Sequence, residues 1–286
     1  MLAWGVLFIS TAPEITWVVF FMMKRIKILL ESFLRHSPIL AIFSLGLGLL
    51  AWQIAARYGG IPAFMLPAPA QVWDRLLQAL ADGSLLTHSM VTLSEVLAGM
   101  MLGVSTASVL GYALAKSRRL ERLLEPYLVA SQAIPVVAVA PLLVIWFGPG
   151  LFSKVLICAL IVFFPVLVNI IVGMRLVPED LRDLMRSLQA NRWQTFAFLE
   201  VPAALPVFLG GLRISATLAT IGAVVGEFTG SDRGLGFLIN VAGGMYDRPL
   251  VFVVIFTLII LAMALYGSVV WLESRLVAWR RNSTFH

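Results

Sequence analysis

Residues that commonly build catalytic and metal sites are scarce in this chain. It has one cysteine, Cys158, and three histidines that lie far apart in the sequence, His36, His88 and His286. A single thiol excludes both a disulfide framework and a cysteine-based metal site within one chain. No Gly-Lys pair occurs, which excludes a P-loop and ATP binding by that route. The sequence therefore predicts no catalytic residue, no metal site and no cofactor bound by this chain.

Charge is also sparse, and apolar residues dominate. Only 13% of the residues are charged and 60% are hydrophobic, which is far from the composition of a soluble globular domain. Several apolar runs reach the roughly 20 residues that a helix needs to cross a bilayer. The net charge of +6 does not indicate nucleic-acid binding, because the basic residues are spread over short loops. We therefore predict an all-α, polytopic membrane protein.

Six apolar runs define a predicted membrane domain over residues 38–273, followed by a basic tail at 274–286. Residues 1–37 are expected to hold either an extra helix or a start upstream of the native one, and then a cytoplasmic flank. A short amphipathic helix is expected at 71–81. The six predicted spans are residues 38–56, 90–115, 123–147, 151–174, 207–229 and 250–272.

The basic residues indicate an orientation for these spans. Most of them fall before the first span, after the second, after the fourth and in the carboxyl-terminal tail. Six spans place these four segments on the same side of the membrane. Because cytoplasmic loops carry the excess of Lys and Arg, we expect both ends of the membrane domain to be cytoplasmic.

The interval between the fourth and fifth spans, residues 177–205, is the longest charged and amphipathic stretch between two apolar runs. We call it the central interval. Pro178 favours a helix start, and an apolar stripe follows at helical spacing through Leu181, Leu184, Met185 and Leu188. A second short segment, through Trp193, Phe196 and Phe198, is expected to stop at Pro202 and Pro206. Such an interval is suited to meeting another protein, with a helix resting on lipid as the alternative.

Ionisable residues inside apolar runs are the remaining clue from charge. An ionisable group at membrane depth is costly and needs a polar neighbour, a cavity or a partner. For Glu95 and Arg213 we expect structural ion pairs. Glu227, near the outer end of the fifth span, is predicted to face either a pathway or the interface between subunits, with a position at the membrane interface as the alternative.

Prolines and glycines mark two of the predicted spans. The third span contains Pro135 and Pro141, which free backbone groups that must be satisfied in protein or at a watery cavity, so a pathway-lining helix is predicted. In the second span, Gly99 and Gly103 form a small-xxx-small pattern that permits close helix approach.

The central interval resembles the cytoplasmic signature of permease subunits of bacterial ATP-binding-cassette importers. That signature reads Glu-Ala-Ala, a Gly six residues after the Glu, and then Ile-x-Leu-Pro. Here Asp183 stands in the Glu place, Gln189 in the Gly place and Pro202 at the end, while Leu184 and Met185 replace the alanines. The likeness extends to residues 66–69, 133–148 and 226–236. Within the family, the chain is similar to the subgroup serving nitrate, taurine, alkanesulfonates and heterocyclic vitamins.

This resemblance implies a type I importer-like fold with a cytoplasmic helix that docks a separate nucleotide-binding ATPase. It further implies two permease copies around one pore, in the inner membrane of a bacterium, and a solute-binding protein that delivers the solute. ATP would be used by the partner, so the chain itself is not an enzyme. The residues expected to dock the ATPase are Asp183, Leu184, Arg186, Ser187, Leu188, Gln189, Ala190, Arg192 and Trp193.

The solute is indicated by one segment. Residues 243–252 resemble the branch associated with riboflavin and thiamine-precursor pyrimidines. The alternatives are the same machinery importing aliphatic sulfonates, taurine or nitrate, and a secondary transporter or channel that works without an ATPase.

Overall fold

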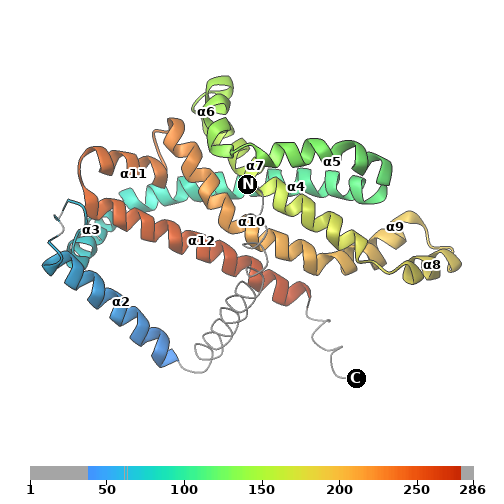
Figure 1. The fold of residues 1–286 in the computed structure, drawn as a ribbon, viewed down its shortest axis with the longest axis horizontal. Helices are drawn as coiled ribbons and strands as arrows, with labels where there is room; N and C mark the ends of the chain where they lie inside the picture. The colour runs from blue at the N-terminus through green and yellow to red at the C-terminus, as the bar shows by residue number, and fades with distance from the viewer. Residues whose placement is uncertain (1–37, 61, 63, 278–286) are drawn as a thin grey trace, which may run out of the picture. The chain divides into compact units, whose positions relative to one another are not determined.

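The computed structural model describes residues 38–60, 62 and 64–277, in two compact units that divide after Pro69. Figure 1 shows helices throughout the described ranges, which contain no strand. The predicted all-α class is therefore confirmed. The expectations for residues 1–37, and for most of the basic tail, lie outside the described residues.

The first unit contains helix α2, Pro38–Tyr58, which coincides with the first predicted span. Its 21 residues match the length that a bilayer requires. The Trp52 indole N–H donates a hydrogen bond to the Pro67 carbonyl (3.1 Å), which folds the following loop back onto the end of this helix.

The second unit holds the other helices in chain order. It begins with the amphipathic helix predicted at 71–81, which is α3. The helices are α3 (Pro69–Ala81), α4 (Ser84–Lys116), α5 (Arg118–Ala133), α6 (Val136–Phe147), α7 (Leu151–Arg175), α8 (Glu179–Ser187), α9 (Arg192–Thr195), the π-helix η1 (Phe196–Glu200), α10 (Val201–Gly230), α11 (Leu235–Gly244) and α12 (Arg248–Leu276).

Helix α7 lies at the centre of the second unit, packed against α4 on one side and α10 on the other. Glycines allow the close approach. A Cβ added at Gly99 would collide with the Cβ of Cys158, and one at Gly103 would lie 2.7 Å from the Ala159 carbonyl oxygen. The predicted small-xxx-small contact is therefore present, and its partner is α7.

Four helical stretches in the described residues are long and apolar enough to cross a membrane: α4, α7, the run from Arg192 to Gly230, and α12. The pair α5 and α6 makes a fifth if the two together form one span. A multi-pass membrane protein is therefore confirmed, and α2 occupies the place of the first predicted span.

The prediction of one continuous helix for the third span is wrong. Helices α5 and α6 meet at 93°, with the break at Ile134 and Pro135. A proline disfavours helical backbone in the residue before it, and Ile134 is accordingly extended (ψ 119°). Pro141 lies inside α6 and does not interrupt it.

The expectation that Pro202 and Pro206 stop the second segment of the central interval is also wrong. The helix continues from α9 through η1 into α10, where Val201 donates its N–H to the Phe196 carbonyl across the π-helical turn. Pro202 stands in the first turn of α10, and Pro206 is accommodated within that helix.

Candidate functional site

The apolar stripe of the central interval is exposed. Leu181, Leu184 and Leu188 of α8 and its carboxyl end are 43%, 53% and 67% exposed, and α8 has no buried residue. The nearby Arg186 side chain pairs with Asp183 of the same helix (2.8 Å). A row of exposed leucines on an otherwise charged helix is a typical surface for another protein or for lipid.

A tight turn follows α8, and Gln189 occupies it with φ +54°. The Ala190 N–H reaches back to the Met185 carbonyl (3.0 Å), which closes the helix end. This left-handed conformation is the one for which glycine is usually chosen. Gln189 therefore keeps the turn geometry, although it replaces the glycine of the signature.

The next helix starts with a cap that the sequence analysis did not identify. Asn191 accepts the Gln194 N–H through its side chain, and the Gln194 side chain accepts the Asn191 N–H, both at 2.8 Å. This reciprocal arrangement is a capping box. The sequence signal that predicts such a box is the spacing Asn-x-x-Gln directly after the turn.

The exposed Trp193 ring, also on α9, lies 5.5 Å from the Phe196 ring, and Tyr112 of α4 meets Phe196 edge-to-face at 5.1 Å. Beside these rings is a cavity of about 750 Å³, almost entirely apolar. It is lined by Ser108, Val109, Tyr112, Ile170, Met174, Arg192, Trp193, Phe196, Val201, Ala204, Leu205 and Phe208.

A buried acid joins the central interval to α4. Glu200, at the end of η1, is 1% exposed and forms an ion pair with Lys116. The Tyr112 hydroxyl donates a hydrogen bond to the other Glu200 oxygen (3.3 Å). The sequence analysis did not predict this pair, because the spacing does not show which basic residue lies beside Glu200.

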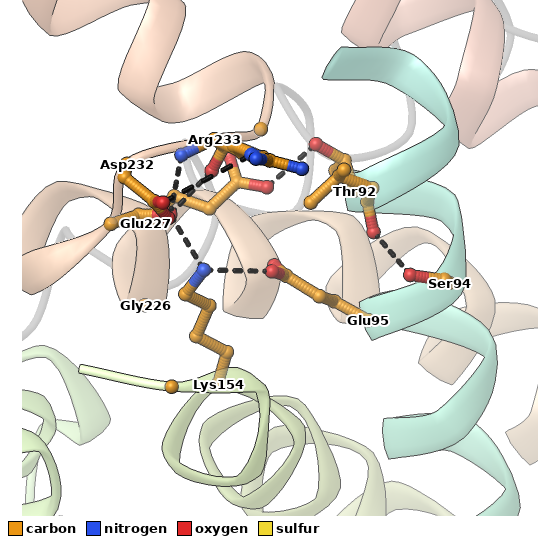
Figure 2. A network of polar contacts seen from close by, with 12 residues as sticks. Thr92, Ser94, Glu95, Lys154, Gly226, Glu227, Asp232 and Arg233 are labelled. Atoms are coloured by element: carbon orange, nitrogen blue, oxygen red, sulfur yellow. Dashed lines mark hydrogen bonds and ion pairs between the residues drawn. The ribbon is translucent and has the colours of Figure 1, made fainter. Parts of the chain in front are cut away.

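At the opposite ends of α4, α7 and α10 lies a second group of polar side chains, which we call the distal polar cluster (Thr92, Glu95, Lys154, Glu227 and Ser231). Lys154 extends from α7 to Glu95 on α4 (2.9 Å) and to the Ser231 hydroxyl after α10 (2.6 Å). Figure 2 shows Lys154 between these two elements. Lys154 and Glu95 are only 4% and 1% exposed.

The predicted structural pairing of the two intramembrane charges is confirmed. Glu95 pairs with Lys154, and Arg213 of α10 forms an ion pair with Glu273 of α12. Lys154, near the start of the fourth predicted span, was missed as a site residue. No signal in the sequence brings it next to Glu95.

Glu227 lies inside the packing of α4, α10 and α11 and is 1% exposed. Thr92 donates its hydroxyl to one Glu227 oxygen (2.6 Å), and the Gly236 N–H donates to the other. Pro135 and Pro141 are exposed on the broken pair of helices. That these three residues line a pathway stays a prediction.

These features define a multi-pass helical membrane protein with an exposed amphipathic segment and no cluster of metal-binding side chains among the described residues. The sequence profile described as "Binding-protein-dependent transport system inner membrane component" matches residues 99–278. The chain belongs to this family of transport components.

Curated relatives include the riboflavin transport system permease protein of Chloroflexus aurantiacus, 50% identical over 234 residues (82% of this chain, 87% of the relative). The formylaminopyrimidine transport permease protein of Halalkalibacterium halodurans is 38% identical over 231 residues (81% and 92%). The taurine transport system permease protein of Escherichia coli is 31% identical over 251 residues (86% and 91%).

A solved structure of an amino acid ABC transporter has a similar fold. The TM-score is 0.57 at 14% identity, and the match covers 70% of this chain and 97% of that chain. At this identity the likeness concerns the fold alone.

Proposed function

We propose that this chain is the membrane-spanning subunit of an ATP-driven importer and forms the translocation pathway for a small solute. The observation that carries the proposal is the exposed leucine stripe of α8, on a segment projecting between two spans of a transport-family permease. A translocator without an ATP site of its own needs such a surface, because a partner that uses ATP must dock on it to drive transport.

In this proposal the partner is a separate nucleotide-binding ATPase, which uses the ATP, while this chain binds no cofactor. Leu184 and Leu188 enter a groove on the ATPase, and Arg186 and Arg192 contact its rim. The full docking set is Asp183, Leu184, Arg186, Ser187, Leu188, Gln189, Ala190, Arg192 and Trp193.

Two copies of this chain surround one pathway in the bacterial inner membrane, in contact with lipid and with both ends of the membrane domain in the cytoplasm. An extracytoplasmic solute-binding protein delivers the solute to the opposite face. The prolines Pro135 and Pro141 of the broken helix pair, together with Glu227, are the pathway candidates.

The solute that we propose is a heterocyclic vitamin or precursor, such as riboflavin or a thiamine-precursor pyrimidine. The riboflavin permease relative at 50% identity supports this class over the taurine class at 31%. Aliphatic sulfonates, taurine or nitrate are the alternative cargo for the same machinery.

The test is uptake in vesicles that contain this permease and the cognate ATPase, with the cognate binding protein added on the opposite side. We expect ATP-dependent accumulation of radiolabelled riboflavin or formylaminopyrimidine, and none of taurine. Accumulation driven by an ion gradient without the ATPase would instead establish a secondary transporter. Taurine uptake would keep the machinery and change the cargo.

A further inference from the structure

Helix α11, Leu235–Gly244, is too short to cross a membrane. It follows α10 at the end remote from α8 and α9, about 45 Å away along the 30 residues of α10. If the central interval is cytoplasmic, α11 therefore belongs to the face that meets the solute-binding protein. The first N–H groups of any helix lack partners within it and need acceptors from elsewhere.

Three consecutive N–H groups at the start of α11 find their acceptors on other helices. Gly234 donates to His88 Nδ1 (3.0 Å), Leu235 donates to Thr92 Oγ1 (2.8 Å), and Gly236 donates to a carboxylate oxygen of Glu227. His88 and Thr92 stand one helical turn apart on α4, and Glu227 is on α10. We call these three side chains the α11 latch.

The latch is internally connected. The Thr92 hydroxyl lies 2.6 Å from Glu227 Oε1 and 3.2 Å from the His88 carbonyl, so the carboxylate is its nearer acceptor. Thr92 thus accepts from α11 and donates to α10 at the same time. Each of the two Glu227 oxygens therefore accepts one hydrogen bond, one from α4 and one from α11.

The backbone at the start of α11 passes close to the Glu227 carboxyl group. Gly234 has φ +112°, which side chains rarely allow, and a Cβ added there would collide with the Glu227 carboxyl group. A Cβ at Gly236 would lie 2.8 Å from the same group. Two glycines therefore let the chain pass directly over Glu227. Lys154 donates a hydrogen bond to Ser231, three residues before Gly234, and so ties this loop to α7 as well.

We propose that Thr92 and Glu227, assisted by His88, are positioning residues for transport. They hold α11 against α4 and α10 in the one placement that a loaded solute-binding protein recognises, so that its binding is transmitted to the spans. This role rests on the proposed importer function. A merely structural latch would affect stability and leave the response to the binding protein intact.

Two matched pairs of variants separate these roles. Thr92→Val keeps the shape of the side chain and removes the hydroxyl, whereas Thr92→Ser keeps the hydroxyl. His88→Ala removes the acceptor of Gly234, whereas His88→Asn places an amide oxygen near the position of Nδ1. Thr106→Val on the same helix is the control, because its hydroxyl bonds only to carbonyls of α4 itself (2.8 and 3.1 Å).

The first measurement is amide hydrogen exchange over residues 234–244 in the assembled complex. Thr92→Val should speed exchange at the start of α11 about tenfold, as expected when one buried hydrogen bond is lost, and Thr92→Ser and Thr106→Val should not. His88→Ala should show the same change as Thr92→Val, with recovery in His88→Asn. Unchanged exchange in both deletion variants would overturn the latch, whatever the transported solute proves to be.

The second measurement is ATP hydrolysis with and without riboflavin-loaded cognate binding protein. We expect basal hydrolysis as in wild type and a stimulation reduced about fivefold or more in Thr92→Val and His88→Ala, restored in Thr92→Ser and His88→Asn. Faster exchange with full stimulation would reduce the latch to a structural role. If the wild type shows no stimulation with the binding protein loaded with riboflavin, formylaminopyrimidine or taurine, the importer function fails, and the exchange comparison still decides whether the latch holds α11.

Discussion

The two ends of the α4, α7 and α10 bundle differ in what they leave exposed. At the distal end, ionisable side chains are buried and find partners within the chain, as Lys154 does with Glu95. At the other end Glu200 is likewise buried and paired with Lys116, but the leucines of α8 stay exposed in the part of the chain that the structure describes. The distal end is thus completed by folding, and we propose that the central interval is completed by a partner.

The largest expected effect comes from breaking the distal end. Lys154→Met leaves Glu95 buried without its cation, which should cost about 3–5 kcal/mol of stability. The measurement is the thermal unfolding midpoint in nanodiscs. Glu95→Gln combined with Lys154→Met should recover most of the loss. Arg186→Ala, at an exposed pair, should cost less than about 0.5 kcal/mol, and a similar loss there would erase the contrast between the two ends.

The next effect concerns the exposed end. Leu188→Asp places a charge in the proposed contact and should weaken ATPase docking by about 2 kcal/mol or more, roughly 30-fold, while the unfolding midpoint stays unchanged. Arg192→Ala should weaken docking only partly. Co-purification and titration of the ATPase measure both. Docking that is unaltered by Leu188→Asp would favour a helix that rests on lipid.

A third pair of substitutions sharpens the comparison within α11. Gly236→Ala forces a methyl group against the Glu227 carboxylate and should destabilise the protein by about 1–3 kcal/mol. Gly243→Ala, which meets nothing within 4 Å, should be neutral or slightly stabilising. The two unfolding midpoints are compared directly. Equal values would mean that the carboxylate moves aside without cost.

The smallest effect belongs to the turn after α8. Gln189→Gly removes the strain of a non-glycine residue at φ +54° and should stabilise the segment by about 0.5–1 kcal/mol. Slower limited proteolysis of the central interval would report it. Because the turn geometry is already present, docking of the ATPase should not change. A loss of docking would show that the Gln189 side chain contacts the partner.

Hydropathy and glycine spacing were sufficient to predict the all-α membrane class, the positions of most spans and the close packing of Gly99. The pairing of Glu95 followed from the cost of an isolated charge in a membrane. Its partner Lys154 did not, because a helical sequence shows which face a residue occupies and not which neighbour that face meets. The hydrogen bonds to the N–H groups of α11 were hidden for the same reason.

The prolines show the limits of a local signal. Pro135 breaks the third span at 93°, whereas Pro141, Pro202 and Pro206 are accommodated within helices. Each lacks an N–H group, but only Pro202 lies in a first turn, where that group needs no partner within the helix. The sequence predicts where a helix is disturbed, but the size of the bend depends on the surrounding packing.

The uninterrupted helical run from Arg192 to Gly230 has a mechanical consequence. Its 39 residues extend about 58 Å and contain no flexible loop between the central interval and the segment that leads into α11. It can therefore act as a lever arm: a tilt of about 5° at one end displaces the other by about 5 Å. A small tilt of the run at the central interval would therefore move the segment that leads into α11 by several ångströms, with no mobile linker between the two.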